Sequence, residues 1–507
     1  MSRALAFLAL CLVAVPSLAS AQAMSPSDAI EAALAAYPGY QASAIEVRRA
    51  RAHVRAEEAR YQLVLHLEGN GNLGTNPSLT SSGNIFGMAV QARTIFPYSE
   101  RINLIAELQR AFDTGTQLAL RTTGYRLFAQ SSFAGTSSIA TTGPGYGLDV
   151  SLTVTQPFLR GFGSEVGAAD LHAARIDLHA REAARDQRAS ELVRDVLQNY
   201  AELWYAQETV RIDEASRDLA ARQQSDAAGR VEVGTLAPAD TLSFATRVAS
   251  MEEALALAEV QRRTRALALA TLLGAAGSSA GGIGPAAGME TRVTDLPTVS
   301  APPTDSEAVQ LAMSRSPQIA QLQAQIEAAQ QAARIATQAI QPRLDASAQV
   351  AFHGLGLDDV GAAFSQVGTV AAVTAMFSLI YETPLEDTRL HEEEERASLA
   401  IDAAEAQLAE ARLTITQQVE SLLQQRAAAR RRIELAEQTV AIAHQTVEAA
   451  QARVEIGSGQ VAILLDAEEQ ERAAQLRLAR AETDLVVADA TLASLTGRLL
   501  DDVVLPE

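Results

Sequence analysis

Two kinds of hydrophobic pattern alternate along the chain, and each predicts a different element. Short runs place apolar residues at every second position, which is typical of strands with one apolar and one polar face. Long runs place them every three or four positions, which is typical of helices that pack lengthwise. The order helix, strands, very long helix, short loop, helix occurs twice. The sequence therefore predicts a mainly α fold with β, built by duplication.

Four runs have the strand pattern, two in each half: residues 61–73, 146–155, 344–353 and 370–381. In residues 344–353, Leu344, Val350 and Phe352 share one face, whereas Asp345 and Gln349 lie on the other. Runs of about ten residues with this alternation suit a transmembrane β-barrel with lipid outside and water inside. Half-buried strands of a soluble sheet show the same pattern. The very long helices that flank each pair of strands, in an exported chain, favour the barrel.

Four strands per chain do not close a membrane barrel. About eight strands is the smallest size, and an open edge in lipid leaves backbone groups without hydrogen bonds. The chain is therefore expected to pool strands with copies of itself, so that two copies supply eight strands and three supply twelve. Residues 75–145 contain a further predicted hairpin over 101–128 that turns at residues 113–116. This region either extends the barrel strands outward or forms an extracellular cap.

The longest helical run, residues 387–452, contains no proline or glycine and predicts a rod of roughly 100 Å. Ile401, Leu408 and Ile415 follow heptad spacing, and a second apolar stripe lies on another face. Residues 164–228 are the counterpart in the first half. Two apolar faces predict neighbours on two sides, as in a ring of helices. A water-soluble coiled-coil rod has the same periodicity, so this pattern alone leaves both open.

The N-terminal residues have the composition of a secretory signal peptide. Residues 1–21 contain Arg3, an apolar core over 5–15 and small residues at the cleavage site. The core is short for a spanning helix, which disfavours a retained membrane anchor. Residues 22–273 are then the first repeat and residues 304–507 the second. Residues 274–303, rich in Gly, Ala, Ser and Pro, are the predicted linker.

Composition excludes several classes of protein. The net charge is −20, from 41 Lys and Arg against 61 Asp and Glu, which disfavours nucleic acid as a partner. The one cysteine, Cys11, lies in the signal peptide, which excludes a disulfide scaffold, a four-cysteine zinc site and thiol catalysis. The sequence contains no HExxH or P-loop motif and no cluster suited to hydrolysis. We therefore expect no enzyme, no catalytic residue, no metal and no cofactor.

Three features together resemble the TolC-like outer-membrane factor (outer-membrane efflux protein) family: the duplicated plan, the two tip loops, and the strand end that reads QPFLRGFG from Gln156. The resemblance covers nearly the whole mature chain. Residues 382–387, at the corresponding strand end of the second half, differ because they lack the glycines of the QPFLRGFG segment. It implies a homotrimer with a twelve-stranded outer-membrane β-barrel continuous with a periplasmic α-helical barrel.

The function that the resemblance implies is a passive export duct of a tripartite efflux or type I secretion system. Its partners would be a periplasmic adaptor, an inner-membrane pump of the RND, ABC or MFS class, and outer-membrane lipid. A structural or adaptor-like coiled-coil protein of the periplasm is the alternative. The cargo, the class of pump and the adaptor are not readable from the sequence.

The two tip loops join each very long helix to the helix that returns from it. They comprise Val233, Gly234 and Thr235 in the first half, and Ile456, Gly457 and Ser458 in the second. Glycine permits a tight turn, and a small neighbour lets another helical hairpin approach closely. We therefore predict that these loops contact the adaptor or pump.

The resemblance also implies an acidic constriction on the second return helix. Asp466 occupies one of the two family positions, and Ile463 the other. Gly459 and Val454 stand where a latch of arginine and tyrosine is found in relatives. Three copies of Asp466 on one axis, with Asp240 at the first return helix, predict a cation-preferring periplasmic gate. Plain surface or capping carboxylates are the alternative interpretation of both aspartates.

Overall fold

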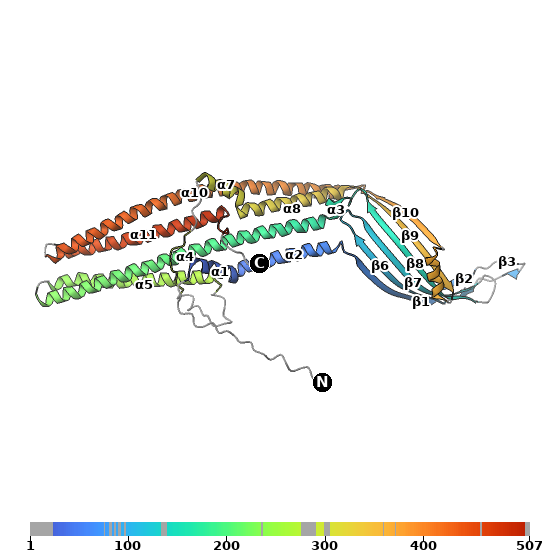
Figure 1. Cartoon of the computed structure of the whole chain (residues 1–507), viewed down its shortest axis with the longest axis horizontal. Coiled ribbons are helices and arrows are strands. Elements are labelled where there is room, and N and C mark those ends of the chain that lie inside the picture. Colours follow the sequence, from blue (N-terminus) through green and yellow to red (C-terminus); the bar gives the residue numbers. More distant parts are fainter. Residues whose placement is uncertain are drawn as a thin grey trace, which may run out of the picture. The chain divides into compact units, whose positions relative to one another are not determined.

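The computed structural model of the chain is shown in Figure 1. It describes residues 24–75, 77–80, 84–85, 88–89, 93–95, 98–132, 139–234, 237–274, 291–298, 305–357, 359–370, 372–456 and 459–501. The predicted signal peptide lies outside the described residues, as does most of the predicted linker. The chain divides into a helical unit (residues 1–47, 181–323 and 407–507) and a sheet unit (residues 48–180 and 324–406).

The helices of the described residues confirm the predicted alternation of short and very long elements. They are α1 (Pro26–Ala36), α2 (Pro38–Ala59), α3 (Ser164–Gly167), α4 (Ala169–Glu232), η1 (Pro238–Asp240), α5 (Thr241–Leu272), α7 (Asp305–Arg315), α8 (Pro317–Ile340), α9 (Val360–Gly368), α10 (Thr388–Glu455) and α11 (Val461–Leu495). The longest, α4 and α10, have 64 and 68 residues. None of the helices described is long and apolar enough to cross a membrane.

The core of the helical unit is built from small and medium side chains. Tyr200, Leu203 and Ala266 are fully buried there, on α4 and α5. Two polar contacts lie within this packing: Ser190 and Ser494 share a hydrogen bond of 2.9 Å, and the Tyr200 hydroxyl donates to the Met24 carbonyl at 2.8 Å. Alanine at many helix contacts lets the helices approach closely, as the alanine-rich heptads predict.

The strands number more than the sequence pattern predicts. They are β1 (Val64–Thr75), β2 (Ser78–Thr80), β3 (Asn84–Ile85), β4 (Met88–Ala89), β5 (Arg93–Ile95), β6 (Tyr98–Ala111), β7 (Gln117–Ser132), β8 (Ile139–Pro157), β9 (Arg343–Leu357) and β10 (Val373–Glu382). Six of them form one antiparallel sheet in the order β1-β6-β7-β8-β9-β10 (Figure 1).

The prediction of four sheet strands per chain is therefore wrong. The hairpin predicted over residues 101–128 exists, and its turn lies where the sequence places it, between β6 and β7. It neither extends the strands outward nor caps them. It lies inside the sheet, between β1 and β8. Alternation tells which face of a strand is apolar, but it does not tell which strand lies beside which, so it did not reveal the place of the hairpin between β1 and β8.

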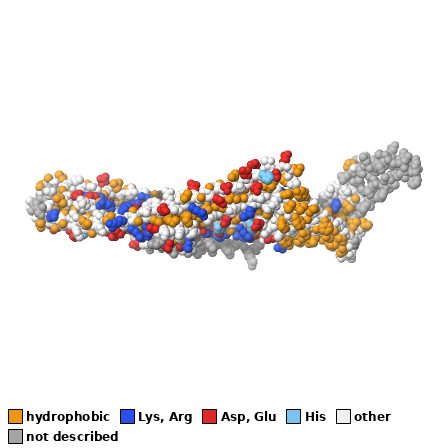
Figure 2. Space-filling model, turned by 90° about the horizontal axis from the view of Figure 1, so that it is seen from above, with side chains coloured by type: hydrophobic (Ala, Val, Ile, Leu, Met, Phe, Trp, Pro, Cys, Tyr) orange, Lys and Arg blue, Asp and Glu red, His pale blue; other side chains and the backbone are white. Residues whose placement is uncertain are grey.

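The sheet has one apolar and one polar face. One row of directly opposite residues crosses all six strands and is apolar throughout: Leu65, Leu108, Leu120, Leu152, Val350 and Ala375. The adjacent row points to the other face and is mostly polar: His66, Glu107, Arg121, Ser151, Ala351 and Thr374. On the face seen in Figure 2, hydrophobic side chains gather over the sheet, whereas charged side chains spread over the helices.

Helix α9 packs against the C-terminal end of β9, on the apolar face of the sheet. A Cβ atom at Gly354 would collide with the Ala363 carbonyl, so this close approach requires glycine. The Gln366 side chain lies beside Leu355, accepting from its N–H at 2.9 Å and donating to its C=O at 2.8 Å. The pairing of β10 with β9 stops at Phe352, so Gln366 bonds the backbone of β9 where β10 no longer reaches.

Candidate gate and docking loops

The first tip loop begins where α4 ends. The Gly234 N–H donates to the Val231 carbonyl at 3.0 Å, and Gly234 has a φ of 75°, a left-handed conformation that favours glycine. Val233 beside it is 73% exposed. Thr235 lies outside the described residues. The structure therefore supports the predicted role of Gly234 in the turn.

The second tip loop turns at a residue that sequence reasoning assigned to a different role. Gly457 and Ser458 lie outside the described residues. The Gly459 N–H donates to the Arg453 carbonyl at 2.9 Å, and a Cβ atom at Gly459 would lie 2.8 Å from the Val454 nitrogen. Gly459 thus closes the turn before α11, which explains why no larger side chain stands at this position.

Exposed apolar side chains surround both loops. Ile456 is 78% exposed, and Leu242 and Ile463 on the return helices are also exposed. Beneath the second loop, Val447, Ala450, Leu464 and Ala467 form a small buried cluster that joins α10 to α11. The hairpin tip is therefore held from within, and its outward apolar side chains remain uncovered in the single chain.

The two predicted gate aspartates lie on different hairpins. Asp466 is exposed on α11, where its carboxylate accepts a hydrogen bond of 2.7 Å from the Gln470 side chain. Asp240 is the last residue of η1, and its side chain lies outside the description. The single chain brings Asp466 near an amide of its own helix, and the gate stays a prediction.

An ion-pair network that the sequence analysis missed joins α11 to α4 and α5 in the helical unit, and so links the two predicted repeats. Arg472 on α11 donates to Asp213 on α4 at 2.7 Å and to Glu469 at 2.7 Å. Arg247 on α5 also donates to Glu469 at 2.7 Å. Asp213 is only 3% exposed, so Arg472 is the cation that compensates for the loss of water around this carboxylate. We call Asp213, Arg247, Glu469 and Arg472 the repeat clasp.

Glu468, next to the repeat clasp, is a buried acid. Burial raises the pKa of Glu468, while the hydrogen bond from Gln223 on α4 opposes that rise. Its neighbour Glu469 behaves in the opposite way, because the hydrogen bond from Arg472 lowers the pKa of Glu469. Spacing alone did not reveal these residues, since charged residues occur on every face of these helices.

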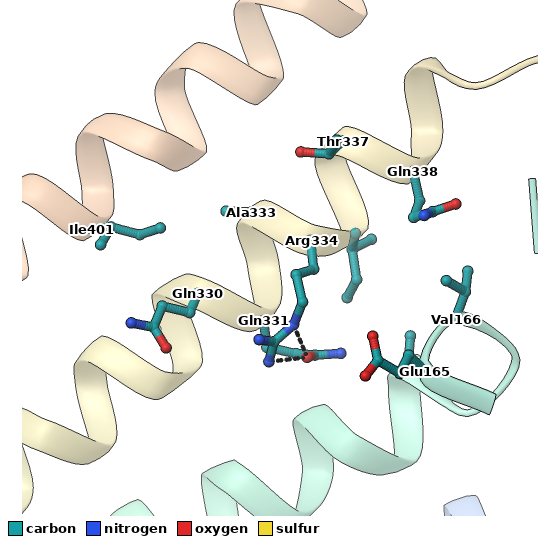
Figure 3. A pocket seen from close by; sticks show the side chains of 11 residues that line it. Glu165, Val166, Gln330, Gln331, Ala333, Arg334, Thr337, Gln338 and Ile401 are labelled. Carbon is teal, nitrogen blue, oxygen red and sulfur yellow. Dashed lines mark hydrogen bonds between the residues drawn. The ribbon is translucent and has the colours of Figure 1, made fainter. Parts of the chain in front are cut away.

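The sheet unit contains a pocket of about 400 Å³ between α3, the start of α4, α8 and α10 (Figure 3). Arg334 on its wall donates to the Gln331 side chain at 3.0 and 2.7 Å, and Glu165 lies across the pocket from both (Figure 3). Ile401 and Val166 contribute apolar wall. Arg334 and Gln331 therefore hydrogen-bond to each other within the wall of the pocket. The described lining residues do not indicate a particular ligand.

Comparisons with known proteins agree with this architecture. Among solved structures, the outer membrane protein VceC from Vibrio cholerae has a TM-score of 0.62 and 18% identity, covering 93% of this chain and 96% of its own. A membrane protein from Pseudomonas aeruginosa has a TM-score of 0.63 and 17% identity, covering 93% and 90%. The open state of the MtrE outer membrane channel of Neisseria gonorrhoeae has a TM-score of 0.60 and 16% identity, covering 94% and 89%. At these identities the likeness shows the fold.

No curated protein matches the chain. The family model described as "Outer membrane efflux protein" matches residues 117–275 and 308–498, which is more than half of the sequence. The chain therefore belongs to the outer membrane efflux protein family, and it serves as an efflux duct of the outer membrane.

Proposed function

We propose that the protein is a passive export duct whose wall is completed by three copies of the chain. The observation that carries this proposal is the sheet: one face is apolar, the other is polar, and β1 and β10 have no further strand beside them in the described part of the chain. An open sheet edge in lipid is costly, because backbone N–H and C=O groups lose water there. Joining β10 of one copy to β1 of the next removes both edges.

The number of copies follows from the family, which implies a homotrimer. A head-to-tail joint of this kind closes into a ring when the rotation between copies is regular. The resemblance implies twelve strands in the ring, four from each copy. The sheet of this chain itself has six strands.

The partners we propose are a periplasmic adaptor and an inner-membrane pump, which supply the energy for transport. The duct itself makes and breaks no bond and needs no cofactor. The docking surface is the pair of tip loops, where Val233 and Ile456 expose apolar side chains beside turn glycines. Asp466 and Asp240 would contribute the acidic gate.

The repeat organisation we propose is that of the sequence analysis: a signal peptide over 1–21, repeats over 22–273 and 304–507, and a linker over 274–303. In support, each repeat supplies one very long helix, α4 or α10, and one return helix, α5 or α11.

The oligomeric state tests the duct directly. Native mass spectrometry of the signal-cleaved protein, extracted from outer membranes in detergent, is expected to show a stable trimer. A soluble periplasmic monomer that keeps all its β-structure would contradict the duct and favour the alternative, a periplasmic rod or adaptor.

The docking loops need a separate measurement. Replacing Gly234 with tryptophan is expected to abolish export while the trimer and its membrane insertion persist. A Cβ atom there has no neighbour within 4 Å, and the backbone strain that a side chain causes at a φ of 75° is confined to this exposed turn. Leu257→Trp is the matched control, on an exposed position of α5 away from the tip. Unchanged export in Gly234→Trp would remove the docking role of this loop.

A further inference from the structure

The inserted hairpin β6–β7 is paired along its full length with the strands on either side. β6 pairs with β1 from Val64 opposite Gln109 to Thr75 opposite Tyr98. β7 pairs with β8 from Gln117 opposite Thr155 to Ser132 opposite Ile139, with one irregularity near Leu127. A cap or an outward extension would share only a few end residues with its neighbours. The hairpin is therefore an integral part of the sheet.

The central part of the hairpin also continues the two faces of the sheet, whereas toward its far end Glu100 and Arg126 form an ion pair on the apolar face. Leu108 and Leu120 join the apolar row, and Glu107 and Arg121 join the polar row. A one-residue slip would reverse both faces, because side chains alternate along a strand. The hairpin thus has the same two-sided character as β1, β8, β9 and β10, with one face for lipid and one for water.

The polar face of the hairpin is built for contact with water rather than for a protein core. Glu107 and Arg121 form an ion pair at 3.9 Å, and the Arg101 guanidinium lies 4.7 Å from the centre of the Tyr125 ring. Asn103 on β6 donates to the Asn70 side chain on β1. These residues extend the polar lining that β1 and β8 already provide.

The turn between β6 and β7 packs closely against residues 161–167, where the helices begin, and we call this contact the hairpin seat. The Gly163 N–H donates to the Thr114 carbonyl at 3.3 Å. A Cβ atom at Gly167 would collide with the Asp113 carbonyl, and one at Gly115 would collide with the Gly161 carbonyl. The backbones can approach so closely because Gly167 of α3 and Gly115 of the turn carry no side chain. The connector is thus shaped to receive this hairpin.

We propose that the barrel of this protein has eighteen strands, six from each of three copies, rather than the twelve that the resemblance implies. This inference rests on the proposed trimer. Barrel diameter grows roughly linearly with strand number. Eighteen strands therefore give a diameter about one and a half times that of twelve, and a lumen of about twice the cross-section. The outer-membrane section then admits cargo too wide for a twelve-stranded exit.

Cysteine pairs distinguish the two arrangements in the full-length trimer, which otherwise has no cysteine after the predicted cleavage site. Ala119 and Thr153 lie directly opposite each other on β7 and β8. Opposite residues on neighbouring antiparallel strands have Cα atoms about 4.5–5.5 Å apart, which a disulfide spans. We expect Ala119→Cys/Thr153→Cys to crosslink within one chain upon oxidation, as seen by peptide mass spectrometry.

The second pair reports the alternative. His66 on β1 and Ser151 on β8 lie in the same row, with β6 and β7 between them. Three strand spacings of about 4.8 Å each exceed the reach of a disulfide. If the hairpin lay outside the wall, β1 would lie beside β8, and His66→Cys/Ser151→Cys would crosslink. We expect no crosslink in this variant.

Electron cryomicroscopy of the detergent-solubilised oligomer then counts the strands. Eighteen strands in a trimer, with the first cysteine pair crosslinked and the second not, support the proposal. A trimer with twelve strands, or a crosslink between His66→Cys and Ser151→Cys, overturns the proposal and leaves the duct intact. A closed ring of two copies with twelve strands overturns both the strand number and the proposed trimer.

Discussion

The two proposed repeats of this chain differ in the sheet unit and match in the helical unit. The first repeat supplies four long strands, β1, β6, β7 and β8, whereas the second supplies β9 and β10. In the helices the repeats are nearly equal, with α4 and α10 differing by a single turn. The two units also differ in how the proposed repeats contact each other. In the sheet unit they contact each other through the hydrogen bonds between β8 and β9, whereas in the helical unit charged side chains of the two repeats form ion pairs.

An antiparallel hairpin can be inserted into such a sheet without changing the direction of the other strands. It leaves and returns at the same end, so β1 and β8 keep their directions and their connections to the helices. The insertion lies on the side of β8 away from β9, and the ladder between the repeats is untouched. An insertion inside α4, by contrast, would move Asp213 away from Arg472. We therefore expect the sheet unit to tolerate a hairpin insertion, whereas the helical unit should be sensitive to changes that separate Asp213 from Arg472.

The largest effect is expected from breaking the repeat clasp. Arg472→Ala leaves Asp213 buried and without its cation, which costs about 3–5 kcal/mol when a buried pair loses one partner. Thermal unfolding of the trimer, followed by circular dichroism, measures this loss. Arg477→Ala is the control, because Arg477 lies on the exposed side of the same helix and contacts only a carbonyl of its own turn. Equal melting temperatures for the two variants would show that the clasp does not hold the repeats together.

A smaller effect is expected from blocking the hairpin seat. Gly167→Leu forces a side chain against the backbone of Asp113, and overpacking of this kind costs about 1–3 kcal/mol. The expected result is a faster proteolytic cut in the β6–β7 turn, with the helical unit unaffected. Gly124→Ala on β7 provides the comparison, since a Cβ atom there meets nothing within 4 Å. If the turn is cut equally slowly in both variants, the seat does not hold the hairpin.

Glu468, next to the repeat clasp, and Glu469, within it, are expected to change stability with pH in opposite directions. Because burial raises the pKa of Glu468 above 4.5, the folded chain binds this proton more tightly than the unfolded chain does. Its contribution to stability is therefore present at low pH and is lost as pH rises through the folded pKa. Glu468→Gln is expected to be more stable than the wild type at pH 7, and the difference should vanish below pH 4.5.

Glu469→Gln is the matched control, with the opposite sign. The pKa of Glu469 is lowered by Arg472, so its contribution is present above pH 4.5 and is lost as pH falls through the folded pKa. The variant is expected to be less stable than the wild type at pH 7. Melting temperatures across this range that shift in parallel for both variants would contradict the two opposite environments.

The smallest effect is expected at the proposed gate. Asp466→Ala removes one ring of three carboxylates, while Ile463 offers no second ring, so block by multivalent cations from the periplasmic side should weaken only modestly. Planar-bilayer recordings of wild type and variant measure this block. Identical block would mean that Asp466 is an ordinary surface carboxylate, as its contact with Gln470 alone would suggest.

The fold was predictable where one element determines its own pattern. The heptads of residues 387–452 located α10, the alternation in residues 344–353 located β9, and residues 113–116 located the turn of the hairpin. Pairing was not predictable. The row that joins Leu108 to Leu65 and Leu120 depends on which strands are neighbours, and dyad alternation is the same for every order of strands.

The candidate site was predictable to a smaller extent. Gly234 was identified because a repeated turn signal marks it in both halves. Arg472 and Asp213 were missed because they are distant in sequence and meet only after two long helices are packed. Gly459 was seen as a missing latch residue, whereas its backbone contact with Arg453 makes it the turn.

Gln366 has a consequence for how copies of the chain recognise each other. Its amide bonds the N–H and the C=O of Leu355 in the manner of a pairing strand, so Leu355 offers neither group to the strand of another copy. The edge available to the next copy is then limited to the ten residues of β10. A short edge with a fixed stop admits fewer sliding registers than a long one. In the proposed ring, one glutamine would therefore limit the registers in which each copy can join the next.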